Sequence, residues 1–250
     1  MKQKCQHLQL KNAKNNIYME LPKNKVGALR KSPKNMVIYG PPKIGKTTVL
    51  SKLDDCLIID LEGGSDMVEA LKVKATNLSE LAEIGKAIMQ NKKPYKYVAI
   101  DTVTKLEEWC EHEGKKIYQN TPMGKNFDKD NKGTSVLSLP NGAGYLYLRM
   151  AFKKWMDRLN MLADHVILVG HLKDKMIDKK GKEVSSKDLD LTGKIKQITC
   201  ANADAIGYIY RENDKTMISF NSMDDITAGS RCDHLRGQEM ELEWSKIFID

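Results

Sequence analysis

Residues 40–47 read GPPKIGKT and match the pattern G-x-x-x-x-G-K-[ST], which forms phosphate-binding loops. In such a loop a first glycine allows a tight turn, and the backbone N–H groups of 43–48 point inward at phosphate oxygens. A lysine in the seventh position reaches the β- and γ-phosphates, and the hydroxyl that follows it binds Mg²⁺. The residues expected around a nucleoside triphosphate are Gly40, Pro41, Pro42, Lys43, Ile44, Gly45, Lys46, Thr47 and Thr48.

The flanks of this loop agree with the motif. An apolar run of strand length precedes it, and the helix-like KTTVLSKL follows it, which is the context that a phosphate-binding loop requires. Pro41 and Pro42 have no N–H group, but they occupy the first part of the loop, where donors are needed least. The alternative is an ordinary strand-turn-helix with a chance pair of glycines.

A magnesium nucleotide usually needs a second protein ligand, an Asp at the end of an apolar strand. Asp101 ends the run YVAID and has Thr102 beside it, whereas Asp60 and Glu62 follow the competing run CLIID. Asp60 comes so soon after Lys46 that only the helix of the loop fits between them. We therefore predict that CLIID is the next strand of the sheet and that Asp101 holds the metal together with Thr47.

Hydrolysis also needs a group that orients the attacking water. Glu62 follows a strand at the edge where ligands bind in parallel sheets, and two glycines after it free the backbone. His171 ends the run HVILVG, which can fill the gap beside the loop strand and aim this histidine at the γ-phosphate. We expect Glu62, Lys46 and His171 to be catalytic. A helix-capping or solvated Glu62 and a merely polar strand end at His171 are the alternatives.

Four apolar runs without polar alternation suit strands that are buried on both faces of a parallel sheet: 36–39, 56–60, 97–101 and 165–170. Helical patterns separate them. One opens with Asn77 and Glu80 at the spacing of a capping box, and another places Leu148, Phe152, Trp155 and Leu159 on one face. This alternation predicts a three-layer α/β domain with a mainly parallel central sheet.

The last third of the chain has a different pattern. Two short strand-like runs flank the polar turn 211–214 and predict a C-terminal β-hairpin. The segments 112–144 and 172–197 are long and polar, and we expect structureless insertions there, which in compact domains are functional or disordered.

Composition limits the class of protein. No apolar run is long enough to span a bilayer, the N-terminus has no apolar signal region, and the five scattered cysteines match neither a zinc site nor a disulfide framework. We therefore expect a protein of the reducing cytoplasm, or of the host cytoplasm if a bacteriophage encodes it.

The net charge of +8 is unevenly distributed. Residues 1–34 hold nine basic side chains and one acidic one, so this stretch carries the whole excess. We predict a basic arm over 1–34 followed by one ATPase domain over 35–250. Such an arm suits a polyanionic partner, although a solvated tail that promotes solubility is the alternative. Within it, 16–22 has the pattern of a short strand that would dock on a neighbouring subunit.

Other nucleotide-binding classes fit less well. No N-K-x-D motif is present to read guanine, and DLEG lies too near Lys46 to leave room for the first switch region of a GTPase. The Arg-rich lid of small-molecule kinases and the protein-kinase pattern are also missing.

The succession GPPKIGKT, LIIDLEGG, YVAIDTVTKLEEW and VILVGH resembles the RecA-like ATPase core over about residues 35–220. In detail it resembles compact nucleotide-binding proteins of bacteriophages, some of which are RecA-core single-strand annealing proteins or recombinases. The resemblance implies a catalytic Glu62, a metal-binding Asp101 next to Thr102, and DNA-binding loops at 112–144 and 173–196. His171 stands where the family often has Gln, which puts the coupling between nucleotide and DNA in doubt.

The second of these loops holds eight Lys and five acidic residues between 173 and 196. Phosphate contacts and a solvated β-ribbon are both compatible with this charge. The expected DNA-binding residues are Lys173, Lys175, Lys179, Lys180 and Lys182. In the first loop, Tyr118 and Phe127 could stack on bases or pack within the protein.

Phosphoryl transfer at a subunit interface generally takes a cation from the neighbouring subunit. The candidates are Lys194, Lys196, Arg211 and Arg231. The expected function is that of a Mg²⁺- and ATP-dependent enzyme that acts on single-stranded DNA in recombination, annealing or replication. It would assemble as a homo-oligomeric ring or filament, with a single-strand-binding protein as a further partner. The alternatives are an ATP-bound accessory or scaffold factor of phage replication with little turnover, and a phosphotransferase.

Overall fold

The computed structural model describes residues 23–130, 132–179, 182–223 and 225–249, with the backbone alone for 174–179 and 182–185. The expected strand at 16–22, most of the basic arm and Lys180 lie outside these ranges. The described part of the arm, 23–34, has no helix or strand and leads into the first strand of the sheet.

The described residues form strands, α-helices and two short 3₁₀ helices. In chain order they are β1 (Asn35–Gly40), α1 (Lys46–Leu50), β2 (Cys56–Asp60), β3 (Lys72–Lys74), α2 (Leu78–Gln90), β4 (Tyr97–Asp101), α3 (Val103–Gln119), η1 (Val136–Ser138), η2 (Pro140–Gly142), α4 (Gly144–Leu159), β5 (His165–Lys179), β6 (Lys182–Leu189), α5 (Gly193–Asn202), β7 (Ala205–Glu212), β8 (Lys215–Ser219), β9 (Gly229–Ser230), β10 (Glu239–Glu241) and α6 (Trp244–Ile247). None of the helices in the described part of the chain has the length and apolar character needed to cross a bilayer.

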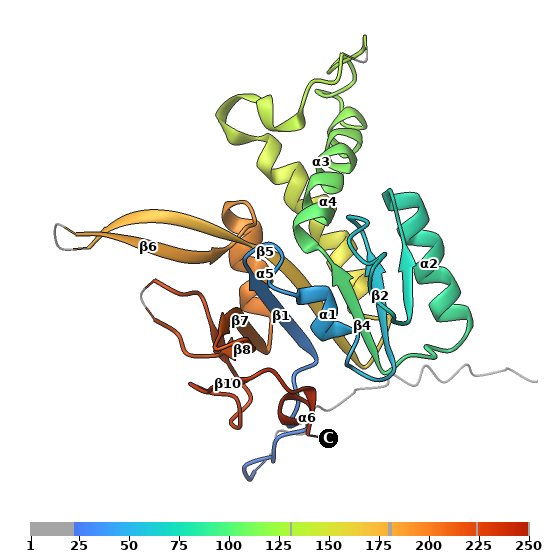
Figure 1. Cartoon of the computed structure of the whole chain (residues 1–250). Coiled ribbons are helices and arrows are strands. Elements are labelled where there is room, and N and C mark those ends of the chain that lie inside the picture. Colours follow the sequence, from blue (N-terminus) through green and yellow to red (C-terminus); the bar gives the residue numbers. More distant parts are fainter. Residues whose placement is uncertain (1–22, 131, 180–181, 224, 250) are drawn as a thin grey trace, which may run out of the picture.

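The strands form one central sheet in the order β10-β8-β7-β1-β5-β4-β2-β3 (Figure 1). The pairs from β7 across to β3 are parallel, and β8, β9 and β10 add antiparallel pairs at the other end. The strand β5 lies between β1 and β4, so the prediction that HVILVG fills the gap beside the loop strand is confirmed.

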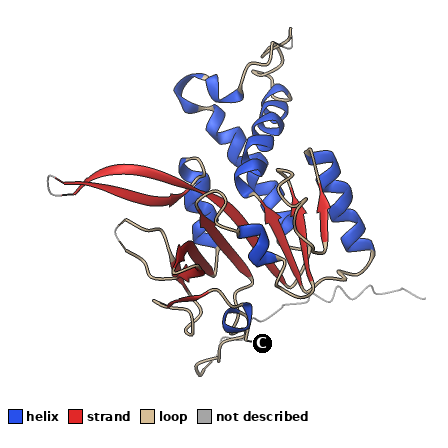
Figure 2. Cartoon of the chain, in the orientation of Figure 1, coloured by secondary structure: helices blue, strands red, loops and turns tan. Residues whose placement is uncertain are grey.

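Helices cover both faces of this sheet (Figure 2). Alternate residues of β1 point to opposite sides: Val37 and Tyr39 join the core beneath α2, α3, α4 and α5, whereas Met36 and Ile38 join the core beneath α1 and α6. The buried strands therefore have apolar residues on both faces, as the unbroken apolar runs predict. The predicted three-layer α/β fold with a mainly parallel sheet is confirmed.

Local signals locate the helices well. The Asn77 side chain caps α2 by accepting hydrogen bonds from the backbone N–H groups of Ser79 and Glu80. The Glu80 carboxylate reaches back one residue further than a capping box requires, to the backbone N–H of Thr76 at 2.7 Å. In α4 the four residues predicted to share one face are all buried in the core.

The helix after the phosphate-binding loop is shorter than predicted. It ends at Leu50. After Ser51 the backbone N–H groups bond to carbonyls only three residues back: Lys52 to Val49 at 3.2 Å and Leu53 to Leu50 at 3.0 Å. This tightening turns the chain promptly into β2.

The expectation of structureless insertions is wrong. The segment 112–144 contains the second half of α3 and two 3₁₀ turns, and 173–189 is a two-stranded antiparallel ribbon of β5 and β6. The ribbon extends away from the body of the molecule, and α3 and α4 run side by side beyond the end of the sheet (Figure 1). These segments are polar and lack the unbroken apolar runs of the buried strands, so composition alone did not identify their helices and strands.

The C-terminal hairpin is confirmed as the pair β7 and β8, which reverses at Asn213 and Asp214. Its first strand also pairs in parallel with β1 up to Tyr208 and then continues to Glu212. The tip of the hairpin therefore stands beside the phosphate-binding loop.

Candidate active site

The phosphate-binding loop follows β1 at the edge of the sheet where the parallel strands end. Gly40 passes so close to β7 that a Cβ atom would lie 2.4 Å from the backbone oxygen of Ile209, so only glycine fits there. Gly45 has a φ of 95°, in the left-handed region that favours glycine, and it is the N-cap of α1. Strand packing and loop conformation therefore each account for one glycine of the motif.

Lys46 is 7% exposed, and its ammonium group is held inside the loop. Its Nζ atom donates hydrogen bonds to the backbone oxygens of Gly40 at 2.9 Å and of Pro41 at 2.8 Å. Burial lowers the pKa of Lys46, and the nearby carboxylates of Asp101 and Glu62 oppose that shift. A buried ammonium with two neutral acceptors is a strong donor for phosphate oxygens, which bind it more tightly than carbonyls do.

Thr47 and Asp101 meet across the site. The Thr47 hydroxyl donates a hydrogen bond of 2.6 Å to Oδ2 of Asp101, the last residue of β4. Burial raises the pKa of the Asp101 carboxyl, against the opposing effect of the Thr47 hydrogen bond. A hydroxyl and a carboxylate side by side are the oxygen ligands that Mg²⁺ takes in nucleotide sites.

The described residues contain no group of three His, Cys, Asp or Glu side chains placed to hold a metal. A cation between Thr47 and Asp101 would therefore take its other ligands from phosphates and water, as Mg²⁺ commonly does. The residues present thus fit a magnesium nucleotide rather than an independent metal centre.

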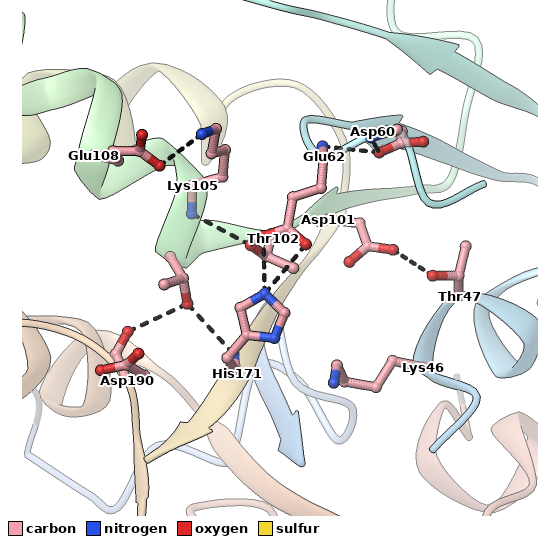
Figure 3. A network of polar contacts seen from close by, with 12 residues as sticks. Lys46, Thr47, Asp60, Glu62, Asp101, Thr102, Lys105, Glu108, His171 and Asp190 are labelled. Atoms are coloured by element: carbon pink, nitrogen blue, oxygen red, sulfur yellow. Dashed lines mark hydrogen bonds and ion pairs between the residues drawn. The ribbon is translucent and has the colours of Figure 1, made fainter. Parts of the chain in front are cut away.

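The carboxylate of Glu62 is held by two neighbours (Figure 3). Its Oε1 accepts a hydrogen bond of 2.5 Å from the Thr102 hydroxyl and lies 2.8 Å from Nε2 of His171, and its Oε2 lies 3.1 Å from the same nitrogen. The side chains of Glu62 and His171 are each about one third exposed, so solvent still reaches them. The structure thus brings His171 onto Glu62, a contact that the sequence did not predict.

Asp60, the rejected metal ligand, organises the turn that carries Glu62. Its carboxylate accepts hydrogen bonds from the backbone N–H groups of Glu62, Gly63 and Ser65 and from the Ser65 hydroxyl. Burial raises the pKa of Asp60, but these hydrogen bonds outweigh it and hold the pKa below its usual value. The run DLEGGS over 60–65 carries a turn signal in the acceptor side chain of Asp60, which the two glycines alone did not reveal.

The register of the sheet explains why these groups meet. Gly40 lies opposite His171 in the pairing of β1 with β5, and Asp60 lies opposite Asp101 in the pairing of β2 with β4. The ends of β1, β2 and β4 therefore meet at one edge, and at that edge β5 passes out of the sheet and continues into its pairing with β6. This is the edge at which parallel α/β sheets bind ligands.

The ribbon starts directly at this site. The backbone N–H of His171 lies 3.3 Å from the Thr104 hydroxyl, which donates to the backbone oxygen of Asp190 at 3.2 Å. The Asp190 carboxylate forms an ion pair of 2.8 Å with Lys173, which raises the pKa of that lysine. The two ends of the ribbon are thereby tied to each other and to the first turn of α3. Of the expected DNA-binding lysines, Lys173 alone has a described side chain.

The aromatic pair of the first expected DNA loop packs within the protein. The rings of Tyr118 and Phe127 are 5.3 Å apart edge to face, and Tyr118 also contacts Tyr147 at 4.9 Å. Of the two interpretations left open for these residues, packing is the one observed.

The four proposed interface cations lie in different surroundings. Lys196 forms an ion pair with Asp188, and Arg231 pairs with Asp204 at 3.6 Å and donates to a backbone oxygen of α5. Arg211 is exposed on the hairpin and borders a cavity that it shares with the phosphate-binding loop of its own chain. Lys194 is exposed on α5, and among the described residues it has no hydrogen-bond or ion-pair partner.

The comparisons with known proteins agree with this geometry. A family model described as AAA domain matches residues 32–232. The match begins just before β1 and ends beyond β9, so it includes the whole phosphate site and the ribbon. No curated protein matches this chain. A model that spans more than half of the chain shows the family, and that family indicates nucleotide binding and ATPase activity. The chain therefore belongs to the AAA domain family, and its fold is that of a P-loop nucleoside triphosphatase.

Proposed function

We propose that this protein is a Mg²⁺-dependent ATPase that acts on single-stranded DNA. The observation that carries the ATPase part is the convergence of Lys46, the Thr47–Asp101 pair and Glu62 at one edge of the sheet. Each of these groups corresponds to one requirement of phosphoryl transfer: neutralising phosphate charge, holding the metal and orienting the nucleophile.

The side chains would divide the work as follows. Lys46 would exchange its two carbonyl acceptors for phosphate oxygens, and Thr47 with Asp101 would hold Mg²⁺, which neutralises charge on the phosphates. Glu62 would accept the proton of the attacking water, because its carboxylate is partly solvated and stands beside the metal-binding pair. Thr102 and His171 would fix the position of that carboxylate.

The ribbon of β5 and β6 supports the DNA part of the proposal. The segment 173–196 has an excess of three positive charges, and its first strand continues directly from His171, which touches the proposed catalytic base. DNA phosphates bound along the ribbon would thus act on a strand that ends in the active site. A ring or filament would place such ribbons along one strand of DNA, with a single-strand-binding protein as a further partner. Recombination, annealing and replication are the processes that this arrangement suits.

One observation favours the second candidate, an ATP-bound accessory factor with little turnover. Both carboxylate oxygens of Glu62 already contact His171, and one also accepts from Thr102. A carboxylate held in this way is less available to a water molecule. Slow turnover without DNA is therefore compatible with the geometry. No contact in the described part of the chain gives a phosphotransferase comparable support.

Phosphate release from ATP, measured with and without a homopolymeric single strand of DNA, tests the proposal. The proposal predicts Mg²⁺-dependent release that rises when DNA is added. Slow release that DNA leaves unchanged would favour the accessory factor. Transfer of phosphate to an added substrate instead of water would favour the phosphotransferase.

A further inference from the structure

A small cavity lies between α4 and α5, next to the start of β1. Its volume is about 40 Å³, and its apolar walls include Val37, Phe152 and Ile195, which belong to the core on that face of the sheet. Asn35 also lines it and is the first residue of β1, whereas the phosphate-binding loop begins at the other end of that strand. The cavity is therefore separate from the active site and lies towards the opposite edge of the sheet.

Three polar side chains of the wall lack a partner. In the ranges that the structure describes, four buried side-chain polar atoms have no hydrogen bond, and three of them line this cavity: Oδ1 of Asn35, Oδ1 of Asn160 and Oγ1 of Thr199. Thr199 as a whole is only 4% exposed. Buried polar atoms without a partner destabilise a fold, so three of them on one cavity indicate a bound molecule that completes their hydrogen bonds.

The local structure explains why these three residues lie together. Asn160 is the C-cap of α4 and comes just before β5, the strand that pairs with β1. The backbone oxygen of Asn35 accepts a hydrogen bond of 2.8 Å from the backbone N–H of Asp204. The backbone oxygen of Thr199 accepts one of 3.2 Å from the N–H of Ala203, directly before Asp204. The end of α5 is thereby attached to the start of β1.

The electrostatic surroundings of the three oxygens favour a cation. Asn160 and Ala203 are the C-caps of α4 and α5, and the C-terminal end of a helix carries a partial negative charge. Lys153 and Asp157, which also line the cavity, form an ion pair of 2.6 Å with each other. Arg149 lines it about three turns before Asn160, roughly 16 Å away along α4. The cationic side chains of the lining are therefore either paired or distant from Asn160.

We infer that the cavity binds a short aliphatic amine in its protonated form. A primary ammonium group has three N–H donors and no acceptor, which matches three unpartnered oxygens. The Thr199 hydroxyl can turn its own hydrogen to a backbone oxygen of the preceding helical turn. The alkyl part packs on the apolar walls. Mg²⁺ and Ca²⁺ fit poorly, because these ions take carboxylate ligands and the three oxygens are neutral.

The volume limits the length of the amine. One water molecule needs about 10–15 Å³ of such a cavity, so about 40 Å³ holds roughly three non-hydrogen atoms. Ethylammonium has that size, whereas a lysine side chain is longer and also brings its backbone. The ligand is therefore a small free molecule, and its site is independent of the proposed ATPase function.

Thermal unfolding of the full chain tests this inference, with ethylammonium chloride as the probe. The melting temperature should rise by about 3–6 °C at roughly ten times the dissociation constant, because the ligand binds the folded state. Potassium chloride at the same concentration is the control, since K⁺ carries the same charge but has no N–H donor. No rise with ethylammonium, or an equal rise with K⁺, would overturn the inference.

Thr199→Val removes the hydroxyl and keeps the shape of the side chain, and the two residues have similar helix propensities. It should weaken ethylammonium binding about tenfold or more, as loss of a hydrogen bond to a charged group does. Thr216→Val on β8, outside the cavity, is the matched control and should respond as the wild type does. If circular dichroism shows that Thr199→Val does not fold, Asn160→Leu takes its place with the same expected loss. A folded variant that binds ethylammonium as tightly as the wild type would overturn the inference.

Discussion

Burial raises the pKa of the Asp101 carboxyl, so keeping this group ionised at neutral pH opposes folding. Because the pKa is higher in the folded chain, the stability that Asp101 contributes is full below its ordinary pKa of 3.8 and is lost as the pH rises through the raised value. Once the pH exceeds that value, Asp101 destabilises the free protein, although it supplies the carboxylate proposed to hold the metal.

We predict that Asp101→Asn unfolds at a higher temperature than the wild type at pH 7 without nucleotide. The amide can still accept the Thr47 hydrogen bond, and the buried charge is gone. The difference in melting temperature should shrink as the pH is lowered towards 3.8. The same variant should bind ATP less tightly when Mg²⁺ is present. If Asp101→Asn is instead less stable than the wild type at pH 7, contacts in the folded state, such as those of Thr47 and Lys46, outweigh the cost of burying the Asp101 charge.

At the scale of elements, the turn after β2 positions Glu62 in the site. Ser65 is fully buried, and its hydroxyl donates a 2.6 Å hydrogen bond to the Asp60 carboxylate that organises the turn. Ser65→Ala removes this donor, which should lower the free energy of unfolding by about 1.5–3 kcal/mol, the usual contribution of a hydrogen bond to a charged group. Denaturant unfolding measures the loss.

An exposed serine supplies the control. Ser79→Ala removes a side chain that is exposed in the first turn of α2, and it should change stability by no more than about 0.5 kcal/mol. Turnover of ATP by Ser65→Ala should also fall, with ATP affinity unchanged, because the turn positions Glu62, whereas the phosphate-binding loop holds Lys46. If the two alanine variants are equally stable, the three backbone N–H groups that donate to Asp60 are enough to hold the turn without the Ser65 hydroxyl.

The ribbon is the element whose role is predicted from charge. Replacing Lys175, Lys179 and Lys182 by Gln should weaken binding to single-stranded DNA and make its salt dependence shallower. The slope of log affinity against log salt should change by about 0.7 for each phosphate contact that is lost. Affinity for ATP should stay the same. An unchanged slope would indicate that the ribbon binds something other than DNA.

At the scale of the whole molecule, the sequence predicted the centre of the sheet, because four apolar runs and one motif limit how the parallel strands can be ordered. The place of β5 between β1 and β4 followed from the need to fill a gap beside the loop strand. The approach of Thr47 to Asp101 was expected because a magnesium nucleotide needs a hydroxyl from the loop and a carboxylate from the end of an apolar strand.

Contacts between side chains from distant loops were harder to predict. The pairing of His171 with Glu62 depends on the rotamers of two residues more than a hundred positions apart, and hydrophobic periodicity carries no information on it. The strand β3 has only three residues, of which none is buried, so no apolar run marks it. The segment of the ribbon was expected to be structureless, with a solvated β-ribbon as one interpretation of its charge, because its sequence has no apolar run that marks a strand.

Assembly is the remaining prediction at this scale. Lys194 is a proposed interface cation that has no hydrogen-bond or ion-pair partner among the described residues. If it serves the neighbouring subunit, Lys194→Ala and Lys46→Ala should each be inactive alone, and mixing them should restore ATP turnover at the sites that combine an intact Lys46 with an intact Lys194. The mixing experiment is read out as phosphate release. If the mixture releases no more phosphate than the two variants do separately, each active site is contained within one subunit.

Turnover by Glu62→Gln tests the central claim most directly, because it separates binding of the nucleotide from its hydrolysis. Glutamine keeps the size of the side chain and an oxygen that can accept from Thr102, but it cannot take the proton of water. The account predicts that Mg²⁺-ATP binds with unchanged affinity and that phosphate release falls by about 10²-fold or more, as for the loss of a positioned general base. A fall of less than about threefold would contradict the account and assign another group to the attacking water.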